Sequence, residues 1–190
     1  MGTSRRHDTK DPRAARTRAL KILFQADVRG VSGEVALRRL ADDDRGLAIL
    51  DDLDLSNDVE AEADRIRRQA EADAEADTTD APASTVPALD GFTRQLVLGV
   101  SDHHDEIDQL IGRHARRWSV DRMPVVDRTV LRLATYELLY EATSAAVVIN
   151  EALELAKSLS TEASGRYVNG VLEAIRKDLA SRDEQDRPGA

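Results

Sequence analysis

Residues 161–175 read TEASGRYVNGVLEAI and place an Asn-Gly pair inside a strong helical pattern. The apolar side chains there fall at i, i+3, i+4, i+7 and i+11, which is one stripe of an α-helix. Glycine costs about 1 kcal/mol relative to alanine inside a helix, so Gly170 needs a reason. We predict that Gly170 lets this helix approach the backbone of a neighbour while Asn169 satisfies a polar group at the crossing; the alternative is that the pair marks a turn. The stripe consists of Val168, Val171, Leu172, Ile175 and Leu179.

The same periodicity recurs along the chain, and no strand-like alternation competes with it, so the sequence predicts an all-α fold. The first helix is expected over residues 12–30, with Gly30 as its stop signal. Its inward residues are Ala19, Leu20, Leu23, Phe24 and Ala26, and its outward residues are Arg13, Arg16 and Lys21. Further helices are expected over 32–41, Phe92–His114 with Asp90 as a cap, 125–141 after Pro124, and 145–160, and the polar C-terminal tail starts at about Ser181.

The length of 190 residues suits one ordinary domain with tails or an insertion. We expect a basic flexible tail over 1–12, a single helical domain over 13–180 that an acidic insertion at 42–86 interrupts, and a flexible tail over 181–190. The absence of cysteine excludes disulfides and thiolate metal sites. Neither a signal peptide nor an apolar run long enough to cross a membrane is visible, so a cytoplasmic protein is expected.

Charge is distributed unevenly, although the whole chain carries a formal net charge of −9. Residues 42–80 contain 15 acidic and 4 basic side chains, whereas residues 1–21 contain 7 basic and 2 acidic ones. The region 42–86 is also poor in aromatic residues and offers little apolar surface to bury. We therefore expect it to be largely disordered, with a transient helix over 58–76.

Four stretches, taken together and in this order, resemble the family of the bacterial transcription antitermination factor NusB. They are RTRALKILFQAD at 16–27, the expected helix Phe92–His114, WSVDRMPVVDRTVLRLATYELLY at 118–140 and VINEALELAKSLSTEASGRYVNGVL at 148–172. The resemblance covers about residues 13–41 and 88–180 and does not extend to the acidic insertion. It implies two packed helical bundles, no catalytic activity and no cofactor. It also implies binding to single-stranded boxA RNA of ribosomal RNA operons together with NusE, a small-subunit ribosomal protein, in the RNA polymerase antitermination complex.

The resemblance points to RNA-binding residues in two places. Arg13 and Arg16 match an arginine-rich motif at the start of the first helix, where cations would contact phosphates. Arg166 and Tyr167 open the last helix, where free backbone N–H groups and an aromatic ring suit a phosphate and a base; the alternative for Tyr167 is a core residue with its hydroxyl at the surface. Ala163 stands where the family often has an acidic residue. Arg5, Arg6 and Lys10 precede the similar block and are expected as helpers.

For the protein partner, Phe24 and Asp127 occupy positions where the family contacts NusE. An aromatic hydroxyl is common at the first position, and Phe24 lacks one, so a hydrogen bond between the two is not expected. Simple core packing is the alternative for Phe24.

The stretch SDHHDE at 101–106 contains several metal-competent side chains, yet no metal site is expected. Adjacent helical residues point about 100° apart, so His103, His104, Asp105 and Glu106 do not converge on one ion. His103 is instead expected to be a partly buried, satisfied histidine.

Two other classes of protein compete with an RNA-binding factor. NusB-like domains also occur fused to ribosomal RNA methyltransferases, but no glycine-rich cofactor loop, P-loop or nucleophile elbow is found in the sequence. A helical adaptor that binds proteins through its acidic segment is the second alternative. The sequence does not distinguish a monomer from a homodimer.

Overall fold

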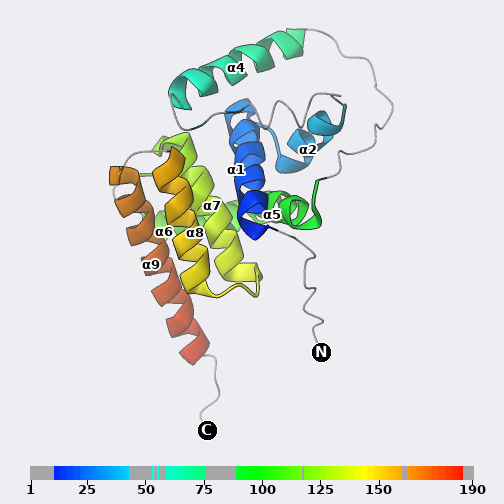
Figure 1. Cartoon of the computed structure of the whole chain (residues 1–190). Coiled ribbons are helices and arrows are strands. Elements are labelled where there is room, and N and C mark those ends of the chain that lie inside the picture. Colours follow the sequence, from blue (N-terminus) through cyan, green and yellow to red (C-terminus); the bar gives the residue numbers. More distant parts are fainter. Residues whose placement is uncertain are drawn as a thin grey trace. The chain divides into compact units, whose positions relative to one another are not determined.

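A computed structural model describes residues 11–42, 53, 55, 59–75, 89–116, 118–159 and 162–185. These residues form helices and their connections without any strand, which confirms the all-α class (Figure 1). The chain divides into two compact units, Met1–Asp102 and His103–Ala190, in agreement with two helical bundles. In the described part of the chain, no helix is both long enough and apolar enough to cross a membrane.

Helix α1 (Pro12–Arg29) opens the first unit and has well-defined ends. Asp11 caps it by accepting hydrogen bonds from the backbone N–H groups of Arg13 (3.0 Å) and Ala14 (3.1 Å). Gly30 ends it in the left-handed conformation at φ 65°, as the stop signal predicted. All five side chains expected to face inward are buried: Ala19, Leu20, Leu23, Phe24 and Ala26.

Helices α2 (Gly33–Asp42) and α5 (Gly91–Asp102) contact α1 and each other. Asp90 caps α5 as predicted, because its Oδ1 accepts from the backbone N–H of Thr93 at 2.9 Å. The continuous helix predicted over Phe92–His114 is wrong. The backbone leaves the helical conformation at His103 (φ −109°, ψ 18°), and α6 starts at the next residue. The sequence did not reveal this break, because a single non-helical residue leaves the apolar period on either side intact.

Helix α4 (Val59–Glu75) lies where a transient helix was expected over 58–76 of the acidic insertion, and it contacts α1. Ala63 and Ile66 form a narrow buried stripe, and Leu53 and Leu55 are buried ahead of it. The charged face is held along the helix by the i,i+3 pairs Arg65–Glu62 and Arg67–Asp64. The short buried stripe of α4 packs this helix on α1, although the average hydrophobicity of the acidic region is low. Apart from Asp42 at the end of α2, the other residues of 42–86 lie outside the described chain.

The second unit consists of α6 (His104–His114), the short 3-10 helix η1 (Val120–Arg122), α7 (Val125–Tyr140), α8 (Ala145–Leu159) and α9 (Glu162–Gln185). Helix α7 starts after Pro124 as predicted and contacts α6, α8 and α9 (Figure 1). Its buried face includes charged side chains, and the guanidinium of Arg132 is satisfied by two hydrogen bonds of 2.7 Å to the carboxylate of Asp108 on α6. This pair joins α6 to the central helix.

Helix α9 runs without interruption through the Asn-Gly pair, so the turn alternative is wrong. The packing role predicted for Gly170 is also wrong, because a Cβ at this position would meet no atom within 4 Å. Both Asn169 and Gly170 are exposed, so neither belongs to the buried apolar stripe of this helix. The tail was predicted to start at Ser181, but α9 continues to Gln185, so the prediction is wrong for residues 181–185. The stripe is buried at Val168, Val171, Leu172 and Ile175 and half-buried at Leu179.

Candidate nucleic-acid interface

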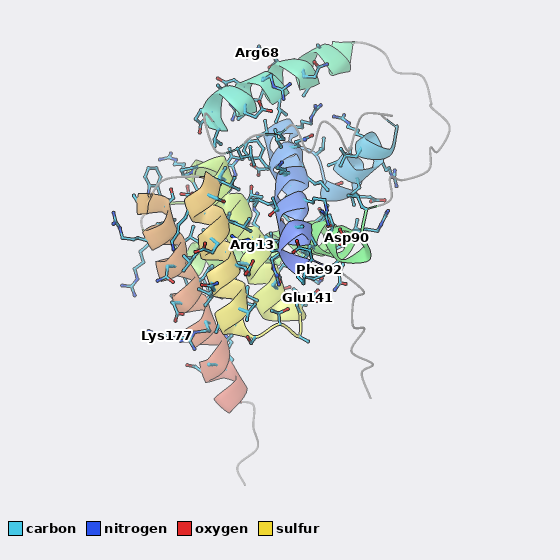
Figure 2. All side chains as sticks on the ribbon, in the orientation of Figure 1. Arg13, Arg68, Asp90, Phe92, Glu141 and Lys177 are labelled. Carbon is cyan, nitrogen blue, oxygen red and sulfur yellow. The ribbon has the colours of Figure 1, made fainter. Side chains whose placement is uncertain are left out.

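The first turn of α1 presents one of its two predicted RNA-binding arginines to solvent. Arg13 is exposed on this turn (Figure 2). Arg16 is only 5% exposed, and its guanidinium carbon lies 5.5 Å from the centre of the Phe92 ring on α5. The outward orientation predicted for Arg16 is therefore wrong. A cation over an aromatic face is an internal packing contact, and the helical period alone could not reveal it because Phe92 is far away in the sequence.

A polar network holds the start of α5 against α1. Arg18 donates to Asp90 Oδ2 at 2.6 Å, and the hydroxyl of Thr93 lies 2.7 Å from the same oxygen and 3.2 Å from the carbonyl of Ala15. Burial raises the pKa of Asp90, but hydrogen bonds from Thr93 and Arg18 and the charge of Arg18 outweigh it, so this pKa lies below its ordinary value of 3.8. The network fixes the turn of α1 from which Arg13 projects. Arg18 and Thr93 were not predicted, because their contacts across the network depend on how α1 and α5 pack.

The helpers Arg5, Arg6 and Lys10 lie outside the described residues. Their contribution to binding stays a prediction.

The second basic region lies where α8 and α9 pack together. Arg166 is exposed there and lines a surface pocket of about 420 Å³. Lys157, which donates to Glu154 at 3.2 Å, lies on the α8 side of the same pocket. The described residues that line it are Leu153, Lys157, Gly165, Arg166 and Asn169. The sequence analysis missed Lys157, because its proximity to Arg166 depends on the packing of the two helices.

Tyr167 is half-buried, and its hydroxyl oxygen is buried without a hydrogen-bond partner among the described residues. Burial raises the pKa of this hydroxyl, and the negative charge of Asp127 raises it further. The hydroxyl therefore points inward, in contrast to the core alternative that placed it at the surface. Only the partly exposed ring is accessible to a base.

Similarity to known proteins extends over both units. The model of the NusB family matches residues 47–177. The transcription antitermination protein NusB of Streptomyces avermitilis is 38% identical over 164 residues, which are 86% of this chain and 89% of that protein. The corresponding protein of Thermobifida fusca is 35% identical over 182 residues, 95% of this chain and 98% of that one.

This chain belongs to the NusB family. The NusB protein of Solibacter usitatus is more similar locally, at 50% identity over 93 residues, but that match spans 49% of this chain and 64% of the relative. Among solved structures, T. maritima NusB is 34% identical, with a TM-score of 0.53 over 90% of this chain and 94% of that one. A crystal structure of the antitermination factors NusB and NusE in complex with dsRNA shares the fold at 24% identity, with a TM-score of 0.53 over 87% of this chain and 96% of that one.

The two NusB-family positions expected to contact NusE are both buried. Phe24 is completely buried in the first unit, which favours its core-packing alternative. Asp127 is 3% exposed, on the first turn of α7 in the second unit. Contact between either residue and NusE stays a prediction.

The histidines near the start of α6 are engaged in side-chain contacts. His103 is partly buried as predicted, and its ring stacks on that of Tyr140 with 4.1 Å between the centres. The hydroxyl of Tyr140 donates to Glu106 at 2.5 Å, and this hydrogen bond is the main reason that the pKa of Tyr140 rises to about 12. Throughout the described residues, no three metal-competent side chains come close enough to hold an ion.

Proposed function

We propose that this NusB-family chain is a non-enzymatic RNA-binding factor that binds boxA RNA together with NusE and acts in transcription antitermination of ribosomal RNA operons. The observation that carries the proposal is the exposed Arg13 on a rigidly capped first turn, in a chain that matches NusB proteins over nearly its full length. A cation in this position contacts phosphates without reordering the helix.

Three described residues have assigned roles in this proposal. Arg13 contacts the phosphate backbone, Arg166 provides a second phosphate contact beside the α8–α9 pocket, and the ring of Tyr167 contacts a base. Arg16 acts indirectly, because it packs α1 against α5 through Phe92. The small number of exposed cations at the start of α1 predicts weak binding by the chain alone and tighter binding once NusE is present.

Filter binding of boxA RNA and of a scrambled single strand, with and without NusE, tests the proposal. Each phosphate contact on a single strand contributes a slope of about 0.7 in log K against log salt, so Arg13→Ala should flatten the dependence by about this amount. Arg68→Ala, which removes an exposed arginine from the acidic helix α4 (Figure 2), is the matched control and should change nothing.

Arg16→Ala separates packing from RNA contact. We expect this variant to lower the melting temperature while the salt slope stays at the wild-type value. An unchanged slope and affinity in Arg13→Ala would remove the role of that residue. Equal affinity for boxA and scrambled RNA in the presence of NusE would overturn the proposed function.

A further inference from the structure

Trp118, the single tryptophan of the chain, is 51% exposed in the connection between α6 and η1. Tryptophan is highly buried on average, because its large apolar ring is unfavourable in water. Nothing in the roles assigned so far uses this side chain. An exposed tryptophan therefore indicates a surface that is covered by a ligand.

The backbone that carries Trp118 is firmly held. The N–H of Trp118 donates to the carbonyl of Ala115, which ends α6, and η1 closes with a hydrogen bond of 3.1 Å from Met123 N–H to the carbonyl of Val120. Ala115, Val120 and Met123 are all buried. Arg128 on α7 also holds the connection, because its side chain donates to the carbonyl of Met123 at 3.0 Å. These hydrogen bonds hold Trp118 and the described residues that follow it, so their backbone has little ordering entropy left to lose on binding.

Several arginines lie close to this tryptophan in the sequence. Arg113, Arg116 and Arg122 are all exposed, and their side chains have no hydrogen bond or ion pair within the described chain. Arg116 is two residues from Trp118, so their Cα atoms are at most about 7 Å apart. Residues 113–122 contain four arginines and a single acidic residue, Asp121.

Other arginines of the same unit behave differently. Arg132 pairs with Asp108, Arg176 with Glu173 and Arg182 with Asp178. Three arginines of the second unit are therefore paired with carboxylates. Arg113, Arg116 and Arg122 have no such partner among the described residues. We define the Trp118 surface as Trp118, Arg113, Arg116 and Arg122.

We propose that the Trp118 surface is a further contact for single-stranded RNA, in which an unpaired base stacks on the indole and the three guanidinium groups contact the adjacent phosphates. Aromatic rings combined with a positively charged surface are the general solution for binding single strands. Bases inside a duplex are not available for such stacking, which restricts the surface to unpaired RNA. The inference rests on the proposed function and adds a site separate from Arg13 and Arg166.

The single tryptophan makes the stacking directly observable. Titration of short boxA RNA into the full chain with NusE, at low salt, should quench the indole fluorescence in step with the binding measured by filter retention. A fully paired duplex of the same length should bind without this quenching. A fluorescence change produced by NusE alone and unaffected by RNA would overturn the inference and assign the surface to a protein partner.

Variants provide an independent test. Trp118→Ala should weaken RNA binding about 5- to 150-fold, the range for loss of one stacked base, whereas Trp118→Phe should recover most of the affinity. Tyr140→Ala is the matched aromatic control, because Tyr140 is 42% exposed in the same unit but lies against Glu106. It should leave the affinity unchanged.

The cationic part of the surface is tested in the same way. Arg116→Ala should lower the salt slope by about 0.7, whereas Arg176→Ala, which removes an arginine paired with Glu173, should not. Tight boxA binding with wild-type affinity and slope in both Trp118→Ala and Arg116→Ala would overturn this inference and leave the proposed function intact. Failure of the wild-type chain to prefer boxA with NusE present would overturn both.

Discussion

The α2–α5 contact in the first unit and the middle of α9 in the second unit each contain a helical glycine, and the two glycines have different physical reasons. At Gly33 on α2, an added Cβ would collide with Ser101 Oγ and lie 2.7 Å from Val97 Cγ1 and 3.0 Å from the Val97 carbonyl oxygen, all on α5. At Gly170, an added Cβ would meet nothing within 4 Å. Gly33 is required by a close approach of two helices, whereas Gly170 is on an open face.

The difference shows that the surroundings of a glycine, rather than the helical pattern around it, decide whether the glycine is needed. Gly33 stands at the start of a short helix, where glycine attracts little notice, and its N–H also donates to Ser101 Oγ at 2.8 Å. Gly170 stands inside a strong helical pattern, yet no described side chain packs against it. Substitutions at both glycines and at one polar contact in each unit test this contrast.

Gly33→Ala is expected to have the largest effect. The methyl group forces Val97 and Ser101 to move, which should lower the free energy of unfolding by about 1–3 kcal/mol. Urea denaturation followed by circular dichroism measures this change. The double variant Gly33→Ala with Val97→Ala removes the nearest carbon atom and should lose less stability than the two single changes added together. A wild-type midpoint for Gly33→Ala would show that α2 and α5 are less tightly packed than described.

Asp90→Asn probes a second contact of the first unit, between α1 and α5. Asparagine caps a helix as well as aspartate, so the variant should lower stability by only up to about 1 kcal/mol at neutral pH, through the lost ion pair with Arg18. The depressed pKa of Asp90 means that its carboxylate stabilises the fold above pH 3.8 and that this stabilisation is lost as the pH falls further, through the folded-state pKa. The variant should therefore lose less stability than the wild type on acidification below about pH 3.8. Melting temperatures between pH 7 and pH 2.5, at about one-unit intervals, measure both effects.

Asp178→Asn on α9 is the control from the second region. Hydrogen bonds from His114 and Arg182 lower the pKa of Asp178, but the group is on the surface and solvent screens these interactions. We expect little change in stability at neutral pH. A larger loss of stability in Asp178→Asn than in Asp90→Asn would contradict this expectation. It would show that the polar contacts at the α1–α5 contact do not contribute more to stability than those on the surface of α9.

Gly170→Ala is expected to have the smallest effect, with the opposite sign to Gly33→Ala. Alanine has a better helix propensity by up to about 1 kcal/mol, and the open face leaves room for the methyl group. The melting temperature should rise. A fall would mean that this face is covered in solution, because none of the described residues packs on it.

Several features of the fold were predictable because their physical causes are local. Gly30 ends α1 through its own left-handed backbone, Pro124 precedes α7 because its ring suits the start of a helix, and Asp90 caps the residues that follow it. The buried stripe of α9 also follows from spacing alone. The exposed position of Arg13 agreed with its expected place on the helix.

Features that depend on distant residues were not predictable. Arg16 lies on the same helix as Arg13 and is the same residue type, but it is buried and packs on the ring of Phe92, which is distant in the sequence. A transient helix was expected over 58–76, but the contact of α4 with α1 was not, because its few apolar residues are buried by a helix that is distant in the sequence.

The amino-acid sequence by itself determined the all-α class, most helix boundaries and the resemblance to the NusB family, since helical period, caps and turn residues act over a few neighbouring positions. The exposure of particular arginines and of Trp118, and the need for one glycine and not another, follow only from the three-dimensional packing. These properties depend on side chains brought together from distant parts of each unit, and their energies come from burial and close contact that no local pattern contains.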